Sequence, residues 1–258
     1  MADVYDVPEE IDVRADGPLR IITLNRPAAL NAVNDALHTG LARLWPQLAE
    51  DRDARAAVLT GGGKAFSAGG DFAYLEELSR DDALRARTIA HGRDLVLGMA
   101  RCRVPVVAAV NGPAVGLGCS LVALSDIVYM AEDAYLADPH VRVGLVAADG
   151  GPLTWPLHTS LLLAKEYALT GARITAERAV AMGLANHVVA DPLAEALACA
   201  GRIAELPRQA VESTKRLLNL HLERAVLATL DFAITAEDQT FQTEDFRTTI
   251  AKLNAGKF

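Results

Sequence analysis

The sequence predicts an α/β protein in which short, mainly parallel strands alternate with helices and an all-helical region follows. Short apolar runs rich in Val, Ala and Ile alternate with segments whose leucines recur at helical spacing. This strand pattern stops after about residue 191. A chain of 258 residues, 51% of them apolar, is large enough for one sizeable core with an appendage. We therefore expect a core at residues 1–190 and a helical region at 191–258.

The elements of the core follow in a regular order. Asn34 precedes leucines at 37, 41, 44 and 48, which predicts a capped helix that ends near Glu50. The other expected elements are strands at 19–24, 56–60, 106–110 and 127–131, and helices at 81–101 and 116–124. Beyond the core, amphipathic helices are expected at 194–205, 207–220, 222–240 and 243–253. Since their apolar faces cannot all be buried on one another, we expect them to pack on the core and on other subunits.

Charge and composition exclude several classes of protein. The formal net charge of −8 argues against a nucleic-acid partner, for which clustered cations supply most of the affinity. The three widely spaced cysteines form neither a disulfide framework nor a metal-binding pair, so no metal is expected. The acidic N-terminus lacks the apolar stretch of a signal peptide, and no apolar run reaches the length of a membrane span. These features favour a cytoplasmic protein without a membrane partner.

Two glycine-rich segments carry most of the functional signal. Residues 64–71 (KAFSAGGD) follow the predicted strand at 56–60, and residues 111–120 (NGPAVGLGCS) follow the strand at 106–110. Because glycine has no Cβ, such turns bring backbone close to a ligand. Two of them side by side could aim two peptide N–H groups at one oxygen, as in an oxyanion hole.

Both segments resemble the AF-x-AG-x-D and AAVNG-x-A-x-G-x-G-C signatures of the crotonase (enoyl-CoA hydratase/isomerase) superfamily. The likeness continues at 24–32 (LNRPAALNA), 125–128, 169–186 and 244–246. The resemblance implies a crotonase-like spiral of ββα units, with C-terminal helices that build a homotrimer or a dimer of trimers (a hexamer). It also implies a lyase or isomerase of fatty acid metabolism, with an acyl-CoA thioester as substrate and no other cofactor.

The resemblance assigns residues to the site. The backbone N–H groups of Ala68 and Leu117 would form the oxyanion hole. The expected substrate and CoA contacts are Ala29, Lys64, Phe66, Ala68, Gly69, Gly70, Asp71, Phe72, Gly116, Leu117 and Ser120. CoA is polyanionic, so cations are also required, and the candidates are Arg26, Lys64, Lys252 and Lys257.

The chain departs from the family at the two positions where hydratases carry glutamates. Ser120 stands at the first and His140 at the second. His140 is our candidate acid/base, because an imidazole with a pKa near 6.5 suits proton transfer at neutral pH. Asp149 would orient this imidazole, or it caps a helix that begins at Gly150.

Other acidic and imidazole side chains carry less signal. Glu237 is expected on a solvated helix face, although it is the distant carboxylate best placed to reach the site. The remaining histidines are expected at the surface or at the edge of the core: His38, His91, His158, His187 and His221.

The leading functional hypothesis is an enzyme that forms an enolate from an acyl-CoA thioester, and that is not a standard enoyl-CoA hydratase. Residues 139–156 are also similar to the β-diketone hydrolase (oxocamphor hydrolase) branch, which uses a His/Asp pair. This likeness makes C–C bond hydrolysis of a diketone by His140 and Asp149 the alternative, although that branch has a further histidine where Leu117 stands here. A third possibility is a non-catalytic homologue that only binds acyl-CoA.

Overall fold

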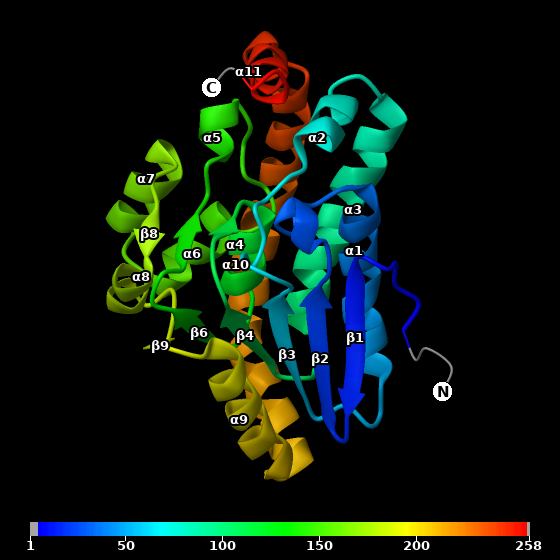
Figure 1. The fold of residues 1–258 in the computed structure, drawn as a ribbon, viewed down its shortest axis with the longest axis vertical. Helices are drawn as coiled ribbons and strands as arrows, with labels where there is room; N and C mark the ends of the chain where they lie inside the picture. The colour runs from blue at the N-terminus through cyan, green and yellow to red at the C-terminus, as the bar shows by residue number, and fades with distance from the viewer. Residues whose placement is uncertain (1–4, 257–258) are drawn as a thin grey trace.

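The computed structural model describes residues 5–256, which fold around a six-stranded sheet (Figure 1). The strands lie in the order β1 (Ile11–Asp16), β2 (Leu19–Leu24), β3 (Ala56–Gly61), β4 (Val106–Val110), β6 (Ile127–Ala131) and β9 (His187–Val189). The first two are antiparallel, and each later neighbour pair is parallel. The strands predicted at 19–24, 56–60, 106–110 and 127–131 are therefore confirmed to within one residue.

A second, three-stranded sheet joins β5 (Ala114–Val115), β7 (Tyr135–Ala137) and β8 (Ile174–Thr175). Successive chain segments contribute one strand to each sheet and then a helix. Thus β4 and β5 precede α4 (Leu117–Ala123), and β6 and β7 precede α5 (His140–Val143). This repetition is the spiral of ββα units that the family resemblance implied.

Helices cover both faces of the six-stranded sheet. On β3, Ala57 and Leu59 belong to a core cluster with α1 (Asp35–Glu50) and α3 (Asp82–Arg101). The alternate residues Ala56 and Val58 pack with α9 (Pro192–Glu205) on the other face. Strand side chains point to opposite faces in turn, so a strand buried on both sides reads as a continuous apolar run. The predicted cap of α1 is confirmed, since the Asn34 side chain accepts a hydrogen bond from the Leu37 N–H at 3.0 Å.

The C-terminal region is helical, with one correction to the expected elements. The two helices predicted at 207–220 and 222–240 are a single 34-residue helix, α10 (Arg208–Phe241), because no glycine or proline interrupts the chain between them. It packs on α3, and α11 (Glu244–Asn254) packs on α2 (Phe72–Leu78) at the top of Figure 1. The remaining helices are η1 (Pro27–Ala29), α6 (Gly151–His158), α7 (Leu161–Thr170) and α8 (Ala176–Met182). Among residues 5–256, no helix is both long and apolar enough to cross a membrane.

Candidate active site

The two glycine-rich segments lie side by side, as the sequence predicted. The Pro113 carbonyl accepts hydrogen bonds from the N–H groups of Phe66 and Ser67, both at 3.1 Å, and Val115 N–H donates to the Ser67 carbonyl at 2.9 Å. Gly116 has φ = 53°, and a Cβ at this position would lie 3.6 Å from the Gly69 Cα and from the His140 Cε1. The left-handed backbone at Gly116 thus brings the second loop against the first, beside the imidazole.

The N–H of Ala68 is not available as an oxyanion donor, which corrects the prediction. It donates to the Leu30 carbonyl at 2.9 Å. The Gly69 carbonyl accepts from the Val33 N–H, and the Asp71 N–H donates to the Val33 carbonyl. Successive backbone groups of an extended segment point to opposite sides, so the N–H of Gly70, which lies between them, points away from Val33 along the cavity wall. Among residues 5–256, neither this group nor the Leu117 N–H at the start of α4 has a hydrogen-bond partner. Gly70 and Leu117 are therefore the candidate oxyanion-hole pair.

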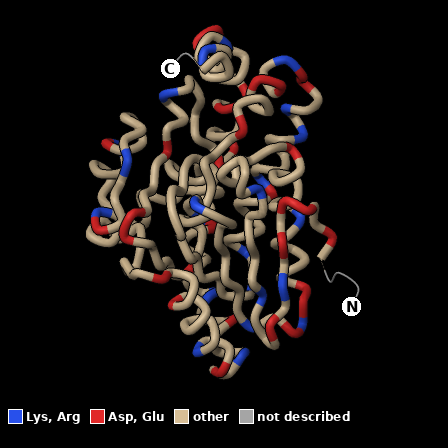
Figure 2. Tube along the Cα trace, in the orientation of Figure 1, with Lys and Arg blue, Asp and Glu red and all other residues tan. Residues whose placement is uncertain are grey.

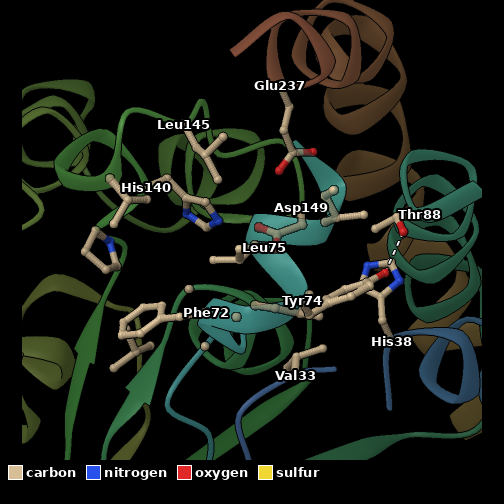
Figure 3. Close-up of a pocket in the computed structure, with 18 of the residues that line it drawn as sticks. Val33, His38, Phe72, Tyr74, Leu75, Thr88, His140, Leu145, Asp149 and Glu237 are labelled. Atoms are coloured by element: carbon tan, nitrogen blue, oxygen red, sulfur yellow. Dashed lines mark hydrogen bonds between the residues drawn. The ribbon is translucent and has the colours of Figure 1, made fainter. Parts of the chain in front are cut away.

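Both donors line a cavity of about 290 Å³, and His140 projects into it from the start of α5 (Figure 3). The imidazole is held by a neighbour that the sequence reading missed. Its Nδ1 lies 2.5 Å from the Oδ1 of Asp138, whose side chain is only 2% exposed. Asp138 follows directly after β7, so the strand end fixes this carboxylate and the ring that it orients. The orienting partner of His140 is thus Asp138 rather than Asp149.

Asp149 has a different role from either of the two expected. It does not cap α6, whose N-cap residue is Gly150 without a side-chain cap. Its Oδ1 instead accepts a hydrogen bond from the Ser120 hydroxyl at 2.9 Å. Ser120 is buried behind the cavity wall, and a Cβ on Gly150 would lie 2.3 Å from the Ser120 Cβ, so this close packing requires glycine. Ser120 is therefore not among the residues of the cavity wall, and it is linked to the cavity through its hydrogen bond to Asp149, which lines it.

Glu237 also lines the cavity rather than a solvated helix face, which corrects the expectation. It enters from α10, and Figure 3 shows its carboxylate directed toward the space between His140 and Asp149. The sequence contains little that could have identified Glu237 as a site residue, because it lies on α10, far along the chain from the other site residues. Three carboxylates from different parts of the chain, Asp138, Asp149 and Glu237, thus surround one imidazole.

This arrangement controls the protonation of the cluster. Burial alone would lower the pKa of His140, but the charges of Asp138, Asp149 and Glu237 outweigh it and raise the pKa to about 10. Burial, together with the neighbouring Asp149 charge, raises the pKa of Glu237 to about 8. Burial also raises the pKa of Asp149, while the His140 charge and the Ser120 hydroxyl oppose that rise. At neutral pH the site therefore contains an imidazolium and a protonated Glu237.

The predicted CoA-contacting residues divide into exposed and buried groups. Ala29 and Lys64 are exposed, and Phe72 is 44% exposed and lines the cavity. The Phe66 side chain is fully buried in the core, so only its backbone could meet a ligand, which corrects that assignment. Asp71 caps α2 by accepting from the Ala73 N–H.

The candidate cations for CoA are also unequal. Arg26 forms an ion pair with Asp71 at 3.2 Å, while Lys64 and Lys252 are exposed. Lys257 lies outside the described residues. Basic and acidic residues are interspersed along the chain in Figure 2, so a CoA phosphate would meet individual cations rather than one large basic surface. Within residues 5–256, no group of three or more His, Cys, Asp or Glu side chains is arranged to hold a metal ion.

One histidine of the cavity was assigned to the surface or the core edge. His38 is only 9% exposed, lies on α1 and lines the end of the cavity formed with α2 and α3. Its position could have been found from spacing, because His38, Leu41 and Trp45 recur at i, i+3 and i+7 on the buried face of α1. His158, His187 and His221 are exposed as expected.

Comparisons with known proteins agree with this architecture. The family described as enoyl-CoA hydratase/isomerase matches residues 15–256. A probable enoyl-CoA hydratase echA8 of Mycobacterium tuberculosis is 33% identical over 239 residues, which cover 92% of this chain and 91% of that protein. The mitochondrial enoyl-CoA hydratase of Pongo abelii is 37% identical over 205 residues, 79% of this chain and 69% of that protein.

Solved structures give the same result. The crystal structure of an enoyl-CoA hydratase/isomerase from Mycobacterium paratuberculosis is 77% identical, with a TM-score of 0.96 over 96% of this chain and 100% of that chain. A putative enoyl-CoA hydratase/isomerase from Acinetobacter baumannii, 24% identical, shares the fold with a TM-score of 0.89 over 96% of this chain and 100% of that one. The crotonase resemblance is therefore confirmed, and the chain belongs to the enoyl-CoA hydratase/isomerase family.

Proposed function

We propose that this protein moves a proton on an acyl-CoA thioester through an enolate, in an isomerisation or an addition–elimination. One observation carries the proposal: the N–H groups of Gly70 and Leu117, which have no partner among residues 5–256, line the same cavity as the side chains of His140, Asp149 and Glu237. The thioester oxygen would accept from both donors as negative charge develops on it. One such preorganised donor is worth about 10²–10³ in rate.

Asp149 is the base in this proposal. Ser120 stands where the family resemblance places a glutamate, and its hydroxyl donates to Asp149, which brings a carboxylate into the cavity from a different loop. The hydroxyl of Ser120 favours the charged form of Asp149. Asp149 would take a proton from the α-carbon, and the C–H electron pair would move into the enolate.

His140 is the acid, and Asp138 is its positioning residue. The carboxylates that raise its pKa keep the imidazole protonated at neutral pH, so Nε2 has a proton to deliver and no free lone pair for water, while Nδ1 is bonded to Asp138. In an isomerisation it would protonate a second carbon, and in an elimination it would protonate the leaving group. Because Ser120 and His140 stand where the family resemblance places the two hydratase glutamates, we expect this enzyme not to be a standard enoyl-CoA hydratase.

The same protonation weakens the diketone alternative. C–C bond hydrolysis by a His/Asp pair needs a neutral imidazole that removes a proton from water, and the carboxylates around His140 disfavour that form below about pH 10. The expected partner, Asp149, is also bound to Ser120 instead. A non-catalytic acyl-CoA-binding protein would have little use for a cluster of three carboxylates and an imidazole at the hole.

Exchange of α-protons tests the proposal without knowledge of the acyl group. Butyryl-CoA is incubated with the protein in D₂O, and deuterium at the α-carbon is followed by NMR. We expect protein-dependent exchange that falls by about 10²–10⁴ in Asp149→Asn. The matched control, Asp133→Asn, changes an exposed carboxylate and should exchange normally. Binding of butyryl-CoA without any exchange would leave only the non-catalytic reading, and full exchange in Asp149→Asn would refute the assignment of the base.

A further inference from the structure

The end of the cavity remote from the catalytic cluster contains a second group of buried polar side chains. His38 of α1, Tyr74 of α2 and Thr88 of α3 all line it, and each is less than 10% exposed. Figure 3 shows them together at the right, with His140 at the left, Glu237 at the top and Asp149 between His140 and this group. An acyl group whose thioester lies in the oxyanion hole would have this group within the same enclosed space.

Two of these side chains form a defined hydrogen-bond chain. Thr88 Oγ1 donates to the Leu84 carbonyl at 3.0 Å, and it lies 2.5 Å from the Tyr74 hydroxyl oxygen. The Tyr74 hydroxyl also lies 3.4 Å from the Oδ1 of Asp35, so the Tyr74 proton is donated to Thr88 or to Asp35, and in neither case are both lone pairs of the Tyr74 oxygen used. The Tyr74 oxygen therefore keeps an unused acceptor position. Burial raises the pKa of Tyr74 to about 12, so the phenol stays protonated.

The third side chain is left without its hydrogen bonds. The Nδ1 of His38 is buried and has no partner among the described residues. Burial, with the nearby His91, lowers the pKa of His38 to about 4, so the ring is neutral at physiological pH. A neutral imidazole offers one donor and one acceptor. Leaving a buried polar group unpaired is costly, and an apolar residue at position 38 would avoid that cost.

We propose that His38 and Tyr74 form a subsite for a hydroxyl group at the distal end of the acyl chain. A hydroxyl can donate to the Tyr74 oxygen and hydrogen-bond to the edge of the His38 ring that lines the cavity. A methyl group could form neither bond, and a carboxylate would find no Lys or Arg among the described residues that line this end of the cavity. The inference rests on the proposed acyl-CoA function and names its substrate class, a hydroxylated acyl-CoA.

Matched saturated thioesters test this subsite by binding. The probes are ω-hydroxyacyl-CoAs with chains of four, six and eight carbons, each compared with the straight-chain alkanoyl-CoA that carries a methyl group in place of the hydroxyl. Dissociation constants are measured by isothermal titration calorimetry. For at least one chain length we expect the hydroxylated probe to bind about 3- to 10-fold more tightly, as one or two neutral hydrogen bonds allow.

Two variants locate the preference. Tyr74→Phe and His38→Leu should each remove most of it while the alkanoyl probe binds as tightly as before or more tightly. Tyr129→Phe is the control, because Tyr129 is also buried but packs on His187 away from the cavity. Thermal unfolding shows whether each variant is folded. If a variant is not folded, the comparison of the two probes on the unmodified protein still tests the subsite.

The outcomes separate the two proposals. Equal affinity for both members of every pair would overturn the subsite and leave the acyl-CoA function standing. A preference that survives in both Tyr74→Phe and His38→Leu would also overturn it. If no acyl-CoA of any length binds, the proposed function and the subsite fail together.

Discussion

Replacement of His140 by glutamine should destabilise the protein in a strongly pH-dependent way. The pKa of this imidazole is raised from 6.5 to about 10, which corresponds to roughly 5 kcal/mol of preference for the protonated form at 1.36 kcal/mol per tenfold change. Glutamine removes the positive charge among the three carboxylates. Glu237 is already protonated near pH 6, and Asp149 takes up a proton when the imidazolium is lost, so we expect a net cost of roughly 2–3 kcal/mol near pH 6.

The sign of the pH dependence follows from the direction of the shift. A group whose pKa is higher in the folded state contributes its full stability below its unfolded pKa and loses that contribution as pH rises through the folded value. The cost of His140→Gln should therefore be largest near pH 6 and shrink toward pH 10. Glutamine keeps a hydrogen-bonding side chain beside Asp138, so packing changes little.

Urea unfolding at pH 6 and pH 10 measures this effect, with His221→Gln as a control at an exposed histidine. The control should cost little at either pH. An NMR titration of the His140 ring carbon gives the pKa directly. A midpoint near 6.5, or a cost of His140→Gln that is the same at both pH values, would refute the charge cluster as the cause.

Three further predictions concern the reaction and the assembly. Hydration of crotonyl-CoA, followed by loss of ultraviolet absorbance, should be at or near background, and a kcat within about 1–10³ s⁻¹ would show that other residues replace the missing glutamates. Ser120→Ala should lower α-proton exchange by about 10-fold or less, because it removes a hydrogen bond to Asp149 but leaves the carboxylate in place. A loss as large as that of Asp149→Asn would instead show that Ser120 takes a direct part in the chemistry. The protein should be a trimer or a dimer of trimers by light scattering, because apolar side chains such as Leu162 and Phe232 are about four-fifths exposed, and a monomer at micromolar concentration would contradict this.

Much of the fold could be predicted because its strands are short apolar runs with clear ends. Strand β2 was found with its boundaries, and Asn34 was identified as the cap of α1. The sequence pattern predicted the elements less well at the boundary within the long helix and in the second sheet. Two helices were expected on either side of residue 221, but nothing between Leu220 and Leu222 breaks a helix and α10 runs through this point. The small strands of the second sheet are two or three residues long, too short for a period to be seen.

The loops of the site could be predicted from the sequence, but the hydrogen-bond partners of its residues could not. The two glycine segments and His140 were identified from residue type and order. The orienting carboxylate was misassigned because Asp138 lies only two residues from His140, and a bend after β7 brings their side chains together. Which N–H of the first loop is free depends on its pairing with Leu30 and Val33, which sequence spacing does not determine. Glu237 and His38 reach the cavity from helices distant in the chain, so the spacing on α1 could show that His38 is buried, but only the tertiary structure places either residue at the site.

The electrostatic coupling within the cluster gives the proposed acid a means of releasing its proton. In the resting site, the Asp149 charge helps to keep the pKa of His140 near 10, which on its own makes the imidazolium a weak acid. When Asp149 takes the α-proton, its negative charge disappears from beside the imidazolium. The pKa of His140 must then fall, because one of the carboxylates that stabilised its charged form is neutral. Proton uptake by the base therefore strengthens the acid at the moment the enolate needs a proton elsewhere. Asp138 keeps the ring in place through both states, and the N–H groups of Gly70 and Leu117 would hold the enolate between them.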